Sequence, residues 1–90
     1  MAERHSDGSR GLRAFLEKHA ISQRSAAEAL GVTDPAVHDW VTGAKRPRAH
    51  HRVSIEVWTR GSVVAASWAF PEERAAARDV VPFDPDTDAA

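Results

Sequence analysis

The chain has 90 residues, no cysteine and a formal net charge of −1, from 12 Lys and Arg against 13 Asp and Glu. This length suits one small domain, and the lack of cysteine excludes disulfides, thiolate zinc sites and thiol nucleophiles. A charge this close to zero argues against a protein that coats nucleic acid by bulk charge.

The charge is unevenly distributed along the chain. Residues 1–60 hold ten Lys and Arg against seven Asp and Glu, a balance of +3, whereas residues 61–90 hold two against six, a balance of −4. The segment AKRPRAHHR (44–52) concentrates four of the cations with two histidines and no acid. Such a run is either a solvated loop or a nucleic-acid contact. The charge distribution as a whole indicates a basic body with an acidic tail.

The first elements are a flexible polar tail over residues 1–10 and an amphipathic helix over residues 11–19. The apolar face of that helix follows the i, i+3, i+4, i+7 spacing and comprises Leu12, Phe15, Leu16 and His19. No apolar run reaches the roughly 20 residues of a membrane helix, and the N-terminus lacks the apolar core of a signal peptide. We therefore expect a cytoplasmic protein with no membrane partner.

The second helix is expected over residues 23–30. Ser22 is a good N-cap for it, and Gly31 suits the left-handed residue that ends a helix. Its buried face is predicted to comprise Ala26, Ala27 and Leu30.

A third helix should start at Thr33 or Asp34, either of which can cap it, and should end at Gly43. Pro35 fits its first turn, where a missing N–H breaks no hydrogen bond. The face turned to the core is predicted to comprise Val37, Trp40 and Val41.

The remaining chain predicts two or three further elements. A fourth helix is expected over residues 48–59, with His51, Ile55 and Trp58 facing inward, and a short helix over residues 64–69. Trp68 in that short helix either covers the core or forms a dimer contact. Residues 71–90 read as a short alanine-rich helix followed by an acidic, disordered tail. The fold class is therefore all-α, with four to five short helices.

The second and third helices have the geometry of a helix-turn-helix. Ala27 permits close crossing of the two helices, and Gly31 turns the chain between them. Val37 and Trp40 anchor the second of the pair in the core, which leaves its opposite face outside. A helix presented in this way can enter a DNA major groove.

The segment ISQRSAAEALGVTDPAVHDWVTGAKRP, continued by IEVWTRGSVVAASW, resembles the Cro and lambda-repressor-like (XRE-type) helix-turn-helix family, including small phage Cro-like and YdaS-like regulators. The resemblance covers residues 11–69 and implies a lambda-repressor-like DNA-binding domain over residues 11–70. It implies a bacterial or phage-encoded transcriptional regulator, expected to be a repressor. Such a regulator would bind a two-fold symmetric double-stranded operator as a homodimer through a recognition helix over residues 34–42.

The resemblance also assigns roles to individual residues. The base-facing positions would be Thr33, Asp34, Pro35, Ala36, His38 and Asp39. Phosphate contacts would come from Gln23, Thr42, Lys45 and Arg46, to which the basic segment adds Arg48 and Arg52.

Two acids on the reading helix depart from the family pattern. Asp34 can be a cap or first-turn acid favoured by the helix dipole, or it can accept from a cytosine amine. Asp39 can face solvent, pair with an arginine, or contact a base. The sequence leaves these alternatives open for both residues.

Other classes of function are less well supported by the residues. His38, His50 and His51 lack the spacing of a metal site, and no serine has a matched base, so we expect no metal, no cofactor and no enzymatic activity. An alternative is an antitoxin or protein-assembly module that uses the same fold, with the acidic tail binding a protein partner.

Overall fold

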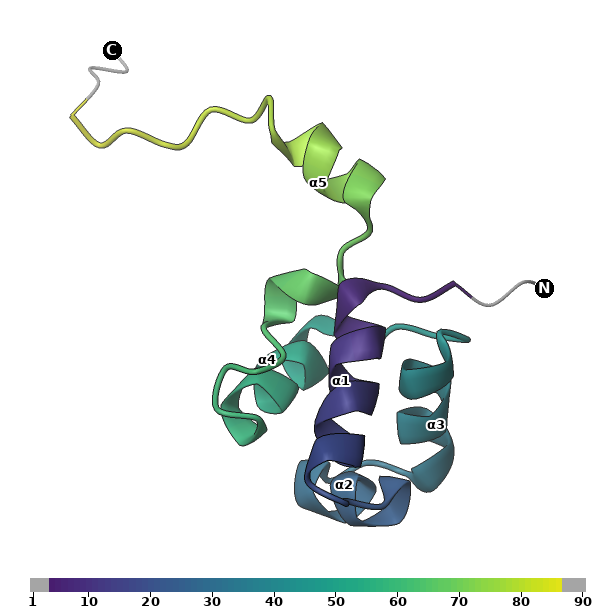
Figure 1. The fold of residues 1–90 in the computed structure, drawn as a ribbon. Helices are drawn as coiled ribbons and strands as arrows, with labels where there is room; N and C mark the ends of the chain where they lie inside the picture. Colours follow the sequence, from purple (N-terminus) through teal and green to yellow (C-terminus); the bar gives the residue numbers. More distant parts are fainter. Residues whose placement is uncertain (1–3, 87–90) are drawn as a thin grey trace.

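The computed structural model describes residues 4–86, and its regular elements are all helical. They are α1 (Asp7–Lys18), α2 (Gln23–Leu30), α3 (Asp34–Thr42), α4 (Ala49–Trp58), the 3-10 helix η1 (Ala65–Trp68) and α5 (Pro71–Ala77). The all-α class predicted from the sequence is therefore confirmed for the described residues (Figure 1).

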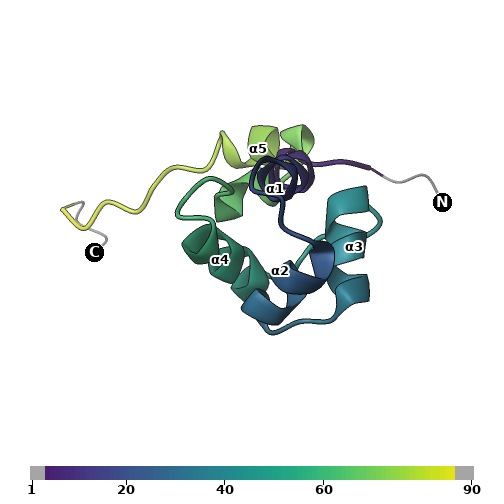
Figure 2. The ribbon, with the colours of Figure 1, turned by 60° about the horizontal axis from the view of Figure 1, so that its bottom comes forward.

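The first four helices and η1 form one body around α1. Helices α3 and α4 lie apart from one another, and α2 lies between them and packs against both (Figures 1 and 2). The 3-10 helix η1 packs against α1 and α4. This arrangement leaves the side of α3 that faces away from α1 at the surface.

The core is built from the apolar faces that the sequence indicated. Its buried side chains are Leu12, Leu16, Ala26, Ala27, Val37, Trp40, Val41, Ile55, Val63 and Trp68. Phe15, Leu30 and Trp58 are only half-buried at its edge, as is His51. His19 was expected on the apolar face, but it is exposed at the end of α1, where its ring contacts Phe15 at 4.6 Å.

Trp68 is a core residue, since none of its surface is exposed in the single chain. Its indole packs directly over the backbone of Gly8, where a Cβ atom would lie 2.4 Å from Trp68 Cδ2. The alternative of a dimer contact at Trp68 is therefore wrong, because the side chain is already covered within its own chain.

The first helix begins four residues earlier than expected. Ser6 caps it by accepting from the Ser9 N–H at 3.1 Å, and Gly8 and Ser9 are buried. The Ser9 hydroxyl also donates to the Trp40 carbonyl oxygen at 2.7 Å. Residues 7–10 therefore belong to the folded body and not to a polar tail, while residues 1–3 lie outside the described residues.

Helix α5 stands apart from the body, and none of its residues is buried. Residues 78–86 continue from it along a path that leads away from α1 (Figure 1). They are exposed and include no regular helix. The expected acidic tail therefore falls partly on this described segment and partly on residues 87–90, outside the described residues.

Candidate nucleic-acid interface

The surface around α2 and α3 is set by three local caps. Ser22 accepts from the Ser25 N–H at 3.0 Å and starts α2. Gly31, at φ 69°, ends α2, and the Val32 N–H then donates to the Ala27 carbonyl at 2.9 Å. This close turn places the start of α3 directly after α2 and fixes the angle between the two helices.

Thr33 is the cap of α3, since its hydroxyl oxygen accepts from the Ala36 N–H at 3.3 Å. Asp34 is the first residue of the helix, where the N-terminal dipole favours an acid. The choice left open between the two residues is thereby settled, and Asp34 has no capping role.

The outward face of α3 is accessible along its length. Thr33, Asp34, Pro35 and His38 are exposed, whereas Ala36 and Asp39 are half-buried. Val37, Trp40 and Val41 occupy the opposite side of the helix in the core. Four of the six predicted base-facing positions are therefore exposed, and Ala36 and Asp39 are only partly accessible.

Asp39 is paired with lysine. Its carboxylate lies 3.9 Å from Lys45 Nζ, and its backbone carbonyl accepts from the Lys45 N–H at 3.2 Å. The Thr42 hydroxyl donates to the same carbonyl at 3.4 Å. The pair brings a cation to the end of α3 and offsets the charge of Asp39 there.

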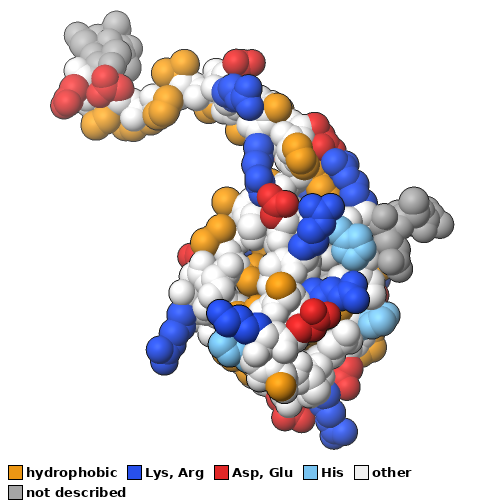
Figure 3. Space-filling model, in the orientation of Figure 1, with side chains coloured by type: hydrophobic (Ala, Val, Ile, Leu, Met, Phe, Trp, Pro, Cys, Tyr) orange, Lys and Arg blue, Asp and Glu red, His pale blue; other side chains and the backbone are white. Residues whose placement is uncertain are grey.

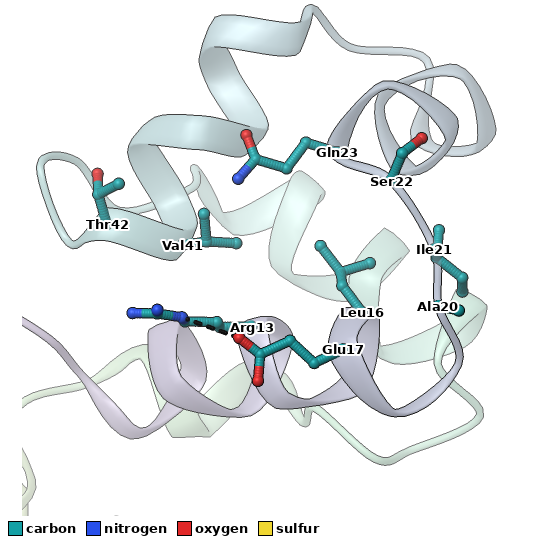
Figure 4. A pocket seen from close by; sticks show the side chains of 9 residues that line it. All are labelled: Arg13, Leu16, Glu17, Ala20, Ile21, Ser22, Gln23, Val41 and Thr42. Atoms are coloured by element: carbon teal, nitrogen blue, oxygen red, sulfur yellow. Dashed lines mark hydrogen bonds and ion pairs between the residues drawn. The ribbon is translucent and has the colours of Figure 1, made fainter.

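A groove of about 610 Å³ separates α1 from the start of α2 and the end of α3 (Figure 4). Its apolar floor is formed by Leu16, Ile21 and Val41. Polar groups at its rim include the side chains of Arg13, Ser22, Gln23 and Thr42. Gln23 and Thr42, predicted to contact phosphate, are therefore brought together here.

Arg13 is a candidate that the sequence reasoning missed. Its Nε donates to Glu17 at 3.2 Å, and both side chains are mostly exposed. Its guanidinium lies along α1 on the side of the groove opposite Gln23 and Thr42 (Figure 4). A salt bridge this exposed contributes about 0–1 kcal/mol, so a phosphate can replace the carboxylate at little cost.

Three of the arginines predicted to contact phosphate differ in their exposure and in the hydrogen bonds they already make. Arg48 is exposed at the start of α4. Arg52 is half-buried, and its Nε donates to the Pro47 carbonyl at 2.7 Å, which holds the loop before α4. Arg46 donates to the Trp68 carbonyl at 3.2 Å and to Glu73 at 2.6 Å, so part of its hydrogen-bonding capacity is already used.

Near Arg46, the N-terminal segment contributes a second arginine whose guanidinium is already bound to a carboxylate. Arg4 binds the carboxylate of Glu72 through both terminal nitrogens, and the Nη2 to Oε2 distance is 2.7 Å. Arg4 and Arg46 both stack on the Phe70 ring, with their Cζ atoms at 3.9 and 4.2 Å from its centroid. The hydrogen bond from Arg4 lowers the pKa of Glu72 to about 2. Helix α5 thus supplies anions to two cations near the end of α3.

The ring of His51 packs against neighbouring aromatic rings. Its ring lies 5.4 Å from Trp40 and 3.9 Å from the ring of His50. Burial, followed by the charges of His50 and Arg48, lowers the pKa of His51 below its ordinary value. Within residues 4–86, no group of three His, Cys, Asp or Glu side chains gathers in a way that suits a metal ion.

No protein-family model, curated protein or solved structure matches this chain. Within the described part of the chain, no helix has the length and apolarity needed to cross a bilayer.

Proposed function

We propose that this protein is a sequence-specific DNA-binding transcriptional regulator with a lambda-repressor-like helix-turn-helix. In this proposal α2 and α3 are the helix pair, and the outward face of α3 reads base edges in the major groove. The observation that carries the proposal is the exposed outer face of α3, held by Thr33 and the buried Val37 and Trp40 next to a groove with polar side chains at its rim.

The groove supports a division of roles between the helices. Gln23, Thr42 and Arg13 can contact backbone phosphates along the groove between α1 and α3, with Lys45 at the end of α3. Phosphate contacts fix the register of a protein on DNA, while side chains on the inserted helix specify sequence. His38 is the exposed residue on α3 best suited to donate to a guanine or a phosphate.

Repression by a homodimer is the mode that suits a chain of this size. One protomer contacts only a few base pairs. When two protomers bind a two-fold symmetric site, their preferences for that sequence over others multiply. The half-sites would then lie about one helical turn apart, roughly 34 Å. A protein bound there can block polymerase without a further domain.

Selection of bound sequences from a random DNA pool tests the proposal, followed by gel-shift titration of the selected site over a salt series. We expect enrichment of a symmetric sequence and a steep loss of affinity with salt. Arg13→Ala and Lys45→Ala should each weaken binding to all sequences and reduce the salt slope by about 1. Arg78→Ala, in the segment after α5, is the control with the same charge change. No enriched sequence, or binding indifferent to salt, contradicts the proposal.

A protein-assembly or antitoxin function is the competing proposal. It is favoured by Asp34, which adds an unneutralised acid to the outer face of α3, and by the exposed acidic segment after α5. DNA binding by the full chain separates an assembly module from the other functions, since an assembly module would bind no DNA. Deleting residues 79–90 then tests for an antitoxin, which would lose its protein partner while each protomer still contacts its half-site.

A further inference from the structure

Six large apolar side chains are exposed among the described residues, and they gather in two places. Val53 and Val57 lie on α4, with Val64 just beyond it, while Val80, Val81 and Phe83 follow α5. We call residues 78–86 the C-terminal arm. Exposed apolar side chains that gather in this way mark interaction surfaces.

Val53 and Val57 border an open groove between α2 and α4. This α2–α4 groove has a volume of about 420 Å³ and is lined by Ala29, Leu30, Val53, Ser54, Val57 and Trp58. Val53 and Val57, one turn apart on α4, are 55% and 72% exposed. The side chains that line the groove are therefore apolar except for one serine, and one of them is aromatic.

The C-terminal arm has the properties of a peptide that fits such a groove. Val80, Val81 and Phe83 are all exposed, and apolar side chains are visible along the arm (Figure 3). Pro82 and Pro85 fix their own φ angles and restrict the residues before them to extended conformations. An extended, proline-containing peptide loses little conformational entropy on binding, and such peptides dock in grooves lined by aromatic residues.

We propose that the C-terminal arm of one protomer binds in the α2–α4 groove of a second copy, and that the exchange is reciprocal. Two identical contacts related by a two-fold axis form a closed dimer. The inference rests on the homodimer of the proposed function and supplies its contact surface.

Charge favours the arm over a second α4 as the occupant. Helix α4 itself is balanced, with Arg52 against Glu56, but Arg48 and Arg60 flank it and give residues 48–60 a balance of +2. The arm, residues 78–86, holds three aspartates against one arginine, a balance of −2. Two α4 helices packed face to face would bring their flanking arginines together, whereas the arm brings acids to them.

Reach favours the arm of a second chain over the arm of the same chain. Arg74 of α5 contacts Asp7 at 3.1 Å, while Trp58 at the groove packs on Phe15, 5.4 Å between ring centroids. Asp7 and Phe15 are eight helical residues apart, about 12 Å. The three residues from α5 to Val80 span about 10 Å at most, and the six residues to Phe83 about 20 Å. Because the arm leads away from α1 and α4 (Figure 1), it would have to turn back on itself for Phe83 to enter its own groove, and Val80 would be left outside.

The exchange also leaves the proposed reading helix uncovered. In both views of the ribbon α4 lies to the left and α3 to the right, and in Figure 2 α2 lies between them (Figures 1 and 2). An arm bound along α4 therefore does not cover the outward face of α3. The same protomer can hold a partner arm and DNA together.

Sedimentation velocity of the full chain without DNA tests the exchange. We expect a dimer for the unaltered protein and a monomer for Val57→Asp, which places an acid in the groove, and for Phe83→Ser, which removes an anchor of the arm. Both side chains are exposed, so circular dichroism should show an unchanged fold. Val64→Ser, an exposed valine that does not line the groove, is the matched control and should stay dimeric.

A mixture of the two variants distinguishes exchange from other contacts. The arm of Val57→Asp and the groove of Phe83→Ser are both intact, so the mixture should form a heterodimer that neither variant forms alone. A dimeric Phe83→Ser beside a monomeric Val57→Asp would instead indicate contact between two α4 helices and overturn the proposal. A monomeric unaltered protein, or a mixture that stays monomeric, also overturns it. Because DNA is absent, a failure of DNA binding leaves this result unchanged.

Discussion

Arg46 donates to the carboxylate of Glu73 at 2.6 Å, joining the loop before α4 to α5. Two similar contacts accompany it, between Arg4 and Glu72 and between Arg74 and Asp7. Since α5 has no buried residue, these exposed contacts and the stacking of arginines on Phe70 hold it in place. Attachment through exposed ion pairs is weak and depends on salt.

Release of α5 should strengthen DNA binding. In Glu73→Gln, Arg46 loses its anionic partner and becomes free to contact a phosphate. We expect affinity for the selected DNA to rise several-fold at low salt and the salt slope to steepen by about 1. Asp79→Asn removes one negative charge from the neighbouring segment without touching Arg46, and serves as the control in the same gel-shift series. Equal gains from both variants would show that only overall charge matters.

Acid should detach α5 before the body unfolds. The folded pKa of Glu72 is lowered from 4.5 to about 2, and that of Glu73 is also lowered, through the Phe70 N–H and then Arg46. Because the carboxyl pKa is lower when α5 is docked, ionisation of the carboxyl stabilises the docked state at pH values above 4.5. This stabilisation is lost as the pH falls from 4.5 towards 2. The protection of the α5 amides against hydrogen exchange, measured relative to the intrinsic rate at each pH, should be lost over this range. Glu72→Gln should show fast exchange already at neutral pH, and an unchanged rate in that variant would contradict the assignment.

Gly8 and Gly11 should respond to alanine in opposite directions. A Cβ at Gly8 would lie 2.4 Å from the indole of Trp68, whereas at Gly11 it would lie 3.6 Å from Val63, an ordinary contact. We expect Gly8→Ala to lower the free energy of unfolding by about 1–3 kcal/mol. Gly11→Ala should raise it by about 0.5–1 kcal/mol, because alanine favours a helix interior. Thermal unfolding of the two variants checks both signs, and a stable Gly8→Ala would mean that Trp68 is packed elsewhere.

On α3, His38 and Asp34 should have separable effects on DNA recognition. His38→Ala removes the exposed donor and should weaken the selected site by about 1–3 kcal/mol relative to other sequences. Asp34→Asn removes repulsion near phosphate, and since Thr33 already caps the helix it should strengthen binding to all sequences alike. Competition binding with substituted sites measures the difference. A changed base preference in Asp34→Asn would instead show that the carboxylate reads a cytosine.

The helices α2 and α3 were predictable because their ends depend on neighbouring residues. Ser22, Thr33 and the glycines at positions 31 and 43 have side-chain or backbone properties that act within one turn. The start of α1 also has a local cap, since Ser6 accepts from the Ser9 N–H, but the poor helix formers Gly8 and Ser9 obscured it. Contacts from Trp68 and the Trp40 carbonyl across the body hold these two residues in the helix.

The candidate site was predictable only in part, for a related reason. Periodicity indicates which face of α3 is outside, and His38 and Asp34 do lie there. It carries no information on which cations find partners. Arg46 looked free in the sequence, but its partners Glu73 and the Trp68 carbonyl lie more than 20 residues away. Arg13 follows the buried Leu12 in α1, and only the packing of α1 against α3 brings it to the groove.

The packing of Trp68 on Gly8 has a consequence for synthesis of the protein. The residue that closes the body lies 60 positions after the turn of α1 that it covers. During translation α1, α2 and α3 leave the ribosome well before that indole is available. The emerging chain therefore exposes the apolar faces of its first helices until η1 has been made. Chaperones that bind apolar segments have this interval in which to act, and the body closes as a unit only after it.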